Sequence, residues 1–193
     1  DITAGSILID GTDIRAVSQH DLRARIGYIP QKSMLFSGTI ESNLRYADEN
    51  ASSEILAEAV ETSQAAEFIN SQSGGLAAEI SQGGANVSGG QKQRLSIARA
   101  LVKRAPIYIF DDSFSALDFK TDAALRRALK NRMRDGSNLL IVTQRVSTIK
   151  NAEQIIVLDE GKVVGKGTHS ELMAGCETYR EIALSQLSEE ELS

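Results

Sequence analysis

The segment Val87-Ser88-Gly89-Gly90-Gln91 stands directly before a basic, apolar run from Lys92 to Lys103. Ser88 is a favourable residue for a helix N-cap, and Gln91 three positions later completes an S-x-x-Q capping box. Apolar residues then recur at helical spacing: Leu95, Ala98, Leu101 and Val102. The sequence therefore predicts a helix that begins at Ser88.

Two glycines occupy the first turn of this predicted helix. Gly89 and Gly90 leave backbone N–H groups uncovered at the positive end of the helix dipole. Such a helix start is an anion site, and a terminal phosphate group fits it. A plainer interpretation, a capped surface helix with a flexible start, explains these five residues equally well when they are taken alone.

The residues after this helix contain a strand that ends in two acids. Ala105 to Phe110 has the pattern of a buried strand, and Asp111 and Asp112 follow it directly. The segment Ser115-Ala116-Leu117-Asp118 comes next. A carboxylate at the end of a buried strand can hold Mg²⁺ beside phosphates, directly or through water. The alternative is that these acids only form a turn.

The chain resembles the nucleotide-binding domain of an ATP-binding cassette (ABC) transporter in the order of three segments: VSGGQ, the apolar strand that ends in Asp-Asp, and SALD. They match that family's signature motif, Walker B strand and D-loop, and the resemblance covers nearly the whole chain. It implies an α/β fold of the P-loop NTPase class, with a mainly parallel sheet core and an inserted helical subdomain. It also implies ATP and Mg²⁺ as cofactors. Strands that alternate with helices favour the same parallel-sheet architecture.

Length and composition suit one soluble globular domain. The chain has 193 residues, of which 41% are hydrophobic and 24% charged. A net charge of −5 argues against a nucleic-acid clamp, which needs a basic stripe, so no nucleic-acid partner is expected. The single cysteine, Cys176, excludes an internal disulfide. No apolar run approaches the roughly 20 residues that span a bilayer.

No G-x-x-x-x-G-K-[ST] phosphate loop occurs in the sequence. In the family that the chain resembles, a strand such as the one predicted within Gly5 to Gly11 lies just downstream of that loop and its helix. The chain also begins with Asp1, so we expect a piece of a longer protein that lacks the N-terminal strands and the phosphate loop. Alone, it is expected to bind ATP poorly and to be inactive.

The resemblance divides the chain into three parts. Residues 1–37 form the N-terminal part of the ATPase core up to the Q-loop, residues 38–104 the helical subdomain with the signature motif, and residues 105–193 the rest of the core. Within the second part, Glu79 to Gly84 takes the place of the T-E-V-G-E-R-G segment of ABC exporters. Three departures weaken this match, but its placement favours an exporter over an importer.

The remaining elements are predicted from local patterns. His169 follows Thr168 in a T-x-x-E capping box, so we interpret it as a helix-start residue and not as a ligand. Ser73 to Ala85 is rich in Gly, Ser and Gln and is predicted to be a loop. The predicted elements are helices within 39–72, 122–133 and 179–187, strands at 26–31, 138–143 and 154–158, a hairpin partner at 162–164, and an acidic tail at 188–191.

The resemblance assigns roles to four residues of the chain's own nucleotide site. Asp111 would hold Mg²⁺. Gln31, at the end of the predicted strand, would contact the metal and the attacking water. Asp112 stands where hydrolytic sites carry the catalytic glutamate, and Gln144 stands where they carry the switch histidine.

The signature segment has a different task in the family. Two ABC domains pair head to tail, so each nucleotide lies between one subunit's Walker B strand and the other subunit's signature helix. Ser88, Gly89, Gly90 and Gln91 would therefore bind the partner's ATP, together with the D-loop residue Asp118.

Asp112 and Gln144 depart from the hydrolytic pattern in the same direction. Aspartate is one methylene shorter than glutamate, and a misplacement of that size can cost on the order of 100-fold in rate. Glutamine can donate a hydrogen bond to a γ-phosphate but cannot become cationic. Either change alone can be neutral drift. Together they predict that this chain contributes an impaired site to a heterodimeric exporter, in which the partner domain is hydrolytically complete. The transmembrane domains of such an exporter would place this chain at the cytoplasmic face of a membrane.

Two other functions remain open at this point. One is a soluble, non-transport ABC ATPase, although the acidic chain shows no heptads or basic arms. The other is a regulatory domain that binds nucleotide but never hydrolyses it, which Asp112 and Gln144 would suit. About six apolar spans upstream of Asp1 would indicate an exporter, and an ATPase assay of the assembled pair would identify a regulatory domain.

Overall fold

The computed structural model of the chain describes residues 2–132 and 136–187. Met133, the last residue of the helix predicted within 122–133, and the predicted acidic tail at 188–191 lie outside the described residues. No helix in the described ranges is long and apolar enough to cross a membrane.

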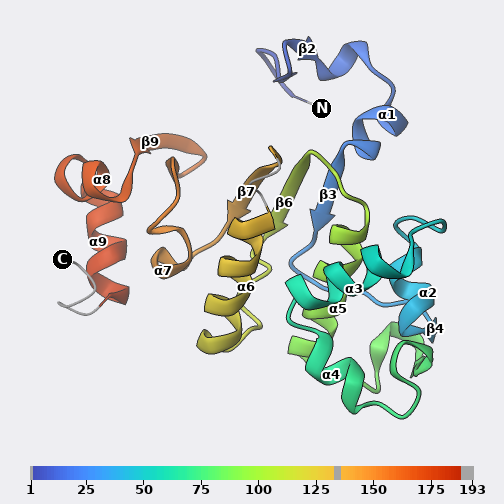
Figure 1. Cartoon of the computed structure of the whole chain (residues 1–193). Coiled ribbons are helices and arrows are strands. Elements are labelled where there is room, and N and C mark those ends of the chain that lie inside the picture. Colours follow the sequence, from blue (N-terminus) through green and yellow to red (C-terminus); the bar gives the residue numbers. More distant parts are fainter. Residues whose placement is uncertain (1, 133–135, 188–193) are drawn as a thin grey trace.

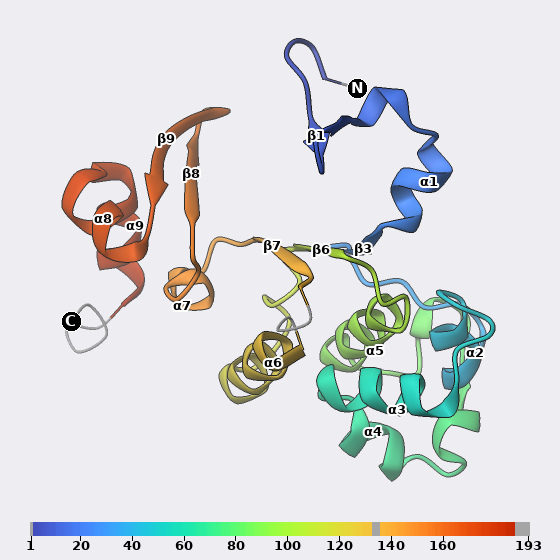
Figure 2. The same ribbon diagram turned by 45° about the horizontal axis from the view of Figure 1, so that its top comes forward.

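A three-stranded parallel sheet forms the centre of the molecule. Its strands are β3 (Ile26–Ile29), β6 (Ile107–Asp111) and β7 (Asn138–Val142), in the order β3-β6-β7. Both neighbouring pairs are parallel, as the alternation of strands and helices predicted. Helices α5 (Gly89–Val102) and α6 (Phe119–Arg132) lie on the same face of this sheet (Figure 2). The carboxyl ends of the three strands therefore meet at one edge, which is where ligands bind in such sheets.

The two faces of the sheet differ in burial. Tyr108 and Phe110 of β6 are buried beneath the helices. Gly27 lies between the Tyr108 ring and α5, where an added Cβ would come within 2.6 Å of the ring, so only glycine fits there. On the opposite face, Tyr28 is 53% exposed and Leu140 54%. One face thus carries the main core, and the other presents large side chains to the surface.

Helices α2 (Ile40–Arg45) and α3 (Ser53–Thr62) pack against α5, and α4 (Ala66–Ser71) follows α3. All three lie in the region where the sequence predicts helices, and they share the main hydrophobic core with the sheet. The predicted loop from Ser73 to Ala85 contains more structure than expected. It holds η2 (Gly75–Ala77), β5 (Glu79–Ile80) and η3 (Gln82–Gly84), and β5 pairs antiparallel with β4 (Gly38–Thr39).

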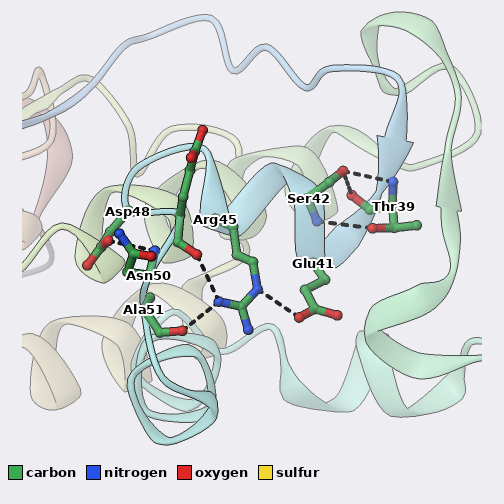
Figure 3. Close-up of polar contacts among 8 residues, drawn as sticks. Thr39, Glu41, Ser42, Arg45, Asp48, Asn50 and Ala51 are labelled. Atoms are coloured by element: carbon green, nitrogen blue, oxygen red, sulfur yellow. Dashed lines mark hydrogen bonds and ion pairs between the residues drawn. The ribbon is translucent and has the colours of Figure 1, made fainter.

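Polar contacts fix the start of α2 and its connection to α3 (Figure 3). Thr39 and Ser42 form a reciprocal capping box at the helix start. Arg45 donates to the Glu41 carboxylate at 2.8 Å and to the carbonyl oxygen of Ala51 at 2.5 Å. One guanidinium therefore ties the helix end to the loop that follows it.

The N-terminal segment is only lightly packed. The strand predicted within residues 5–11 is shorter than expected, because β1 spans only Leu8–Ile9 and pairs with β2 (Thr12–Asp13). A short helical turn, η1 (Ile14–Ala16), and α1 (Gln19–Ala24) lead from it to the sheet. Leu8 is 57% exposed.

The C-terminal elements have a hydrophobic core of their own. They are α7 (Val146–Ile149), β8 (Ile155–Asp159), β9 (Lys162–Gly167), α8 (His169–Gly175) and α9 (Glu177–Gln186). Strands β8 and β9 form the predicted antiparallel hairpin. The second core contains Val146, Ile155, Val157, Leu172, Cys176, Tyr179, Ala183 and Leu187.

Candidate nucleotide site

Helix α5 begins at the predicted residue. The Ser88 hydroxyl accepts a hydrogen bond from the backbone N–H of Gln91 at 3.3 Å. In return, the Gln91 side-chain oxygen accepts from the backbone N–H of Ser88 at 2.8 Å. This reciprocal pair is the capping box that the sequence predicts. It orders the helix start with local contacts alone.

The two glycines behind this cap have different surroundings. A Cβ added to Gly89 would meet no atom within 4 Å, so this residue faces open space. A Cβ added to Gly90 would lie 3.4 Å from the carbonyl oxygen of Ala116. The first N–H groups of a helix have no partner within the helix. The α5 start therefore offers backbone donors beside free space, and any larger side chain at Gly89 would fill that space.

The carboxyl edge of the sheet brings three predicted residues together. Asp111 ends β6, and Asp112 follows it. The side-chain Nε2 of Gln31 donates to the Asp112 carboxylate at 3.2 Å. The Tyr28 hydroxyl donates to the Asp111 carboxylate at 2.8 Å. This hydrogen bond raises the pKa of Tyr28 above its ordinary value, and partial desolvation and the negative charge of Asp111 act in the same direction.

The backbone at Asp112 is held in an unusual conformation. Its φ is +44°, in the left-handed region that aspartate tolerates better than most residues. Its N–H donates to the carbonyl oxygen of Val142 at 2.8 Å. The buried Ser113 hydroxyl donates to the carbonyl oxygen of Ile29 at 2.9 Å. The residues after β6 are thus fastened to the ends of both neighbouring strands.

Gln144 lies at the same edge, two residues after β7. Its carbonyl oxygen accepts a hydrogen bond from the Gln186 side chain at 2.8 Å. The next residue, Arg145, donates to the carbonyl oxygen of Ser115 at 3.0 Å and lies over the Phe119 ring. The loop that carries Gln144 therefore contacts both the SALD segment and the C-terminal helix.

Asp118 acts as a cap for α6. Its carboxylate accepts from the backbone N–H of Thr121 at 2.9 Å and from the Thr121 hydroxyl at 2.7 Å. These bonds lower the pKa of Asp118, the backbone bond most. Because of this cap, α6 begins at Phe119, three residues before the predicted start at Asp122.

The α5 start and the sheet edge are separate. Within residues 2–132 and 136–187, no hydrogen bond or ion pair joins Ser88, Gly89, Gly90 or Gln91 to Asp111, Asp112, Gln31 or Gln144. Gly90 of the α5 start lies close to the segment after β6, because a Cβ added to it would be 3.4 Å from the carbonyl oxygen of Ala116. The chain therefore carries two groups of candidate residues with no polar contact between them in the described ranges.

Sequence analysis missed three residues that contact the site. Tyr28 was not identified, although its register opposite Ile109 puts it on the same sheet face as Asp111, two residues further along β6. Arg145 carries a weak signal as a basic residue just after a strand. Gln186 carries none, since it lies more than 40 residues from its partner Gln144.

The described residues contain no group of three or more His, Cys, Asp or Glu side chains arranged to hold a metal ion. Mg²⁺ does not need one, because it is usually held by one or two carboxylates together with phosphate and water oxygens. The Asp111 carboxylate and the Gln31 amide oxygen are oxygen atoms that could serve as Mg²⁺ ligands at this edge. The Gln31 amide nitrogen already points to Asp112, which leaves its oxygen for a cation.

Comparison with known proteins decides the family. The family model described as ABC transporter matches residues 1–115. This chain belongs to the ABC transporter family. The order of the signature segment, the strand into Asp111 and the SALD segment is thereby explained.

The relatives are bacterial transporter proteins. An uncharacterized ABC transporter ATP-binding protein of Mycobacterium tuberculosis is 47% identical over 96% of the chain and 32% of its own length. An ATP-dependent lipid A-core flippase of Desulfotalea psychrophila is 42% identical over 90% of the chain and 30% of its own length. The chain spans about a third of the length of these curated relatives.

A solved structure gives the same result for the fold. A bacterial Atm1-family ABC exporter with ATP bound superposes with a TM-score of 0.93 at 37% identity. The match covers 98% of this chain and 33% of the exporter chain. The chain thus has the nucleotide-binding fold of an ABC exporter.

Proposed function

We propose that this chain is the ATP-binding domain of an ABC exporter. It pairs head to tail with a second nucleotide-binding domain and couples ATP binding and hydrolysis to export across a membrane. The observation that carries the proposal is the separation of the α5 start from the sheet edge. Each region is half of a nucleotide site, so a second domain is needed to complete both. Relatives named as a flippase and an exporter support the direction of transport.

The residues present fit the groups that the family implies. Gly89 combines open space with unpaired backbone donors, which suits a phosphate of ATP. Asp111 and the Gln31 amide oxygen suit Mg²⁺. When bound, Mg²⁺ neutralises negative charge that develops on the transferred phosphoryl group.

The roles at the sheet edge follow from the side chains. Asp112 is the base that orients and deprotonates the attacking water, and the Gln31 amide holds its carboxylate in place. Gln144 donates a hydrogen bond to the terminal phosphate. Aspartate reaches less far than glutamate, and an amide lacks the charge of a protonated histidine. This site is therefore impaired, while the signature helix serves a complete site whose catalytic residues come from the partner.

The three-part division predicted from the sequence belongs to the same proposal. Residues 1–37 and 105–193 form the core, and residues 38–104 form the helical subdomain that receives the transmembrane domains at the cytoplasmic face of the membrane. An exposed aromatic residue supports this docking role, because Tyr46, which directly follows α2, is 70% exposed. Nucleic acid is not a partner.

Restoring the hydrolytic residues tests the proposal. In the complete heterodimer, Asp112→Glu with Gln144→His should raise single-turnover hydrolysis at this site by about 100-fold, with the partner's site disabled. Asp159→Glu, on the exposed end of β8, is the matched control and should change nothing.

The two possible failures of this experiment have different meanings. A slow residual rate at this site that the double variant does not raise would mean that Asp112 and Gln144 do not limit the site. A second outcome is that all ATPase activity is lost when the partner's site alone is disabled and does not recover in the double variant. This outcome would favour a regulatory domain that binds nucleotide without hydrolysis.

A further inference from the structure

The side chain of Gln186, the last residue of α9, pairs with the backbone of the loop that carries Gln144. Its Nε2 donates to the carbonyl oxygen of Gln144 at 2.8 Å, and its Oε1 accepts from the N–H of Val146 at 2.9 Å. A carbonyl and the N–H two residues later point to the same side of an extended chain. One carboxamide can therefore bind both groups at once.

This pairing replaces a missing helix cap. Val146 begins α7, and the N-cap residue Arg145 makes no side-chain hydrogen bond to the helix start. The N–H groups of a first helical turn need an acceptor from elsewhere, and Gln186 supplies it. Val146 is 2% exposed and packs in the C-terminal core with Tyr179 and Leu187. The contact is thus supported by packing on both sides.

Two arginines hold the same loop from other directions. Arg145 donates to the carbonyl oxygen of Ser115 at 3.0 Å, and Arg126 of α6 donates to that of Ser147 at 3.0 Å. Of these anchors, which all lie in the described part of the chain, only Gln186 bonds the carbonyl of Gln144 itself. The direction in which the Gln144 side chain leaves the backbone depends on how that peptide group is oriented.

We propose that Gln186 is a positioning residue for the nucleotide site. It orients the Gln144 peptide so that the Gln144 side chain reaches the terminal phosphate, and it does so without touching nucleotide. The inference rests on the proposed function, which puts Gln144 at that phosphate. Through Gln186, the C-terminal core contributes to the preference of this site for ATP over ADP.

The test measures the ratio of ATP to ADP affinity at this site in the complete transporter. Gln144→Ala should lower the ratio about fivefold, the equivalent of one hydrogen bond to phosphate. Gln186→Ala should lower it about threefold, because Gln144 remains but is less well oriented. In the double variant the ratio should equal that of Gln144→Ala alone, since Gln186 acts only through Gln144.

A second variant separates positioning from simple loss of folding. Gln186→Glu keeps an acceptor for Val146, and so keeps the cap of α7, but it turns the donor facing Gln144 into a carboxylate oxygen. It should preserve thermal stability and still lower the ATP-to-ADP ratio. The control is Ser185→Ala, which removes only a bond to the Ile182 carbonyl within α9 and should leave the ratio unchanged.

The outcomes separate failure of the inference from failure of the proposed function. If Gln144→Ala leaves the ratio unchanged, Gln144 is not at the terminal phosphate, and the proposed role of this loop is wrong. If Gln144→Ala lowers the ratio but Gln186→Glu does not, or if the effects of Gln186→Ala and Gln144→Ala simply add, then Gln186 has only a structural role.

Discussion

The α5 start and the carboxyl edge of the sheet are built from contacts of very different range. At the α5 start, Ser88 and Gln91 are three residues apart and satisfy each other. At the sheet edge, Tyr28 and Asp111 are 83 residues apart, and Gln31 and Asp112 are 81 apart. The α5 start therefore forms wherever the helix forms. The contacts at the sheet edge exist only when strands β3 and β6 are paired.

This difference predicts that a charge at the α5 start damages function without damaging the fold. Gly89→Asp adds a side chain where no atom lies within 4 Å, and a carboxylate in the first turn of a helix is favourable. In the complete transporter it should reduce ATP hydrolysis at the partner's site on the order of 100-fold, because it repels the phosphate. Steady-state ATPase rates and thermal unfolding, measured together, check this.

Gly89→Ala is the matched control, because it adds bulk without charge. It should reduce the rate less than Gly89→Asp does and leave the unfolding temperature nearly unchanged. Full ATPase activity in the aspartate variant would mean that no phosphate binds at the α5 start, and the comparison between the two regions would lose its basis.

A smaller effect is expected when one long-range contact at the sheet edge is removed. Tyr28→Phe deletes the hydroxyl that donates to Asp111. The carboxylate is then less well oriented for Mg²⁺, so the Mg²⁺ concentration needed for half-maximal ATP binding should rise about fivefold. The dependence of ATP binding on Mg²⁺ concentration measures this shift. Mn²⁺ in place of Mg²⁺ allows metal binding to be followed by electron paramagnetic resonance.

Tyr46→Phe removes a hydroxyl from a residue that is 70% exposed at the end of α2, away from the sheet edge, so it is the matched control. If both variants need the same Mg²⁺ concentration, the contact between Tyr28 and Asp111 does not help to hold the metal.

The smallest expected effect is a pH dependence of the C-terminal core. His169 lies in that region, its Nδ1 is 2.8 Å from the Tyr179 hydroxyl, and its Nε2 has no hydrogen-bond partner among the described residues. Burial lowers the pKa of His169, and the charge of Lys150 lowers it further. The folded state therefore binds a proton less readily than the unfolded state, whose histidine has a pKa of about 6.5. Stability is complete above that pH and declines as the pH falls through it towards the lower folded pKa.

Unfolding by denaturant between pH 7.5 and pH 5 checks this expectation. His169→Asn keeps a polar atom near Tyr179 but does not titrate, so it should lose less stability on acidification than the unmodified chain. His20→Asn, at a side chain that is 92% exposed, should retain the original pH dependence. If the free energy of unfolding falls equally with pH in His169→Asn and in the unmodified chain, this account is contradicted.

Sequence analysis could predict those features that depend on neighbouring residues. It predicted the helix from Ser88, the capping box at Thr168 and the antiparallel hairpin near Gly161, each from a pattern within a few positions. His169 is the helix-start residue that the pattern indicated, since α8 begins there. The order of the motifs was enough to identify the family, because several linked segments are rarely found together by chance.

Features that depend on tertiary contacts were not predictable in the same way. Strand β5 lies inside the predicted loop and pairs with β4, about 40 residues earlier in the chain, and no local sequence pattern indicates this pairing. The earlier start of α6 depends on how Asp118 uses its side chain, which its type alone does not determine. The contact of Gln186 with the loop after β7 follows from the packing of α9 on α7, so it required the assembled C-terminal core.

The most direct test is a structure of the complete transporter trapped with a non-hydrolysable ATP analogue and Mg²⁺. We predict that the terminal phosphate held by the second nucleotide-binding domain lies about 3 Å from the backbone nitrogens of Gly89 or Gly90 or from the Ser88 hydroxyl. An α5 start that faces only water or protein in that state, with the nucleotide bound entirely by the other domain, would contradict the central claim.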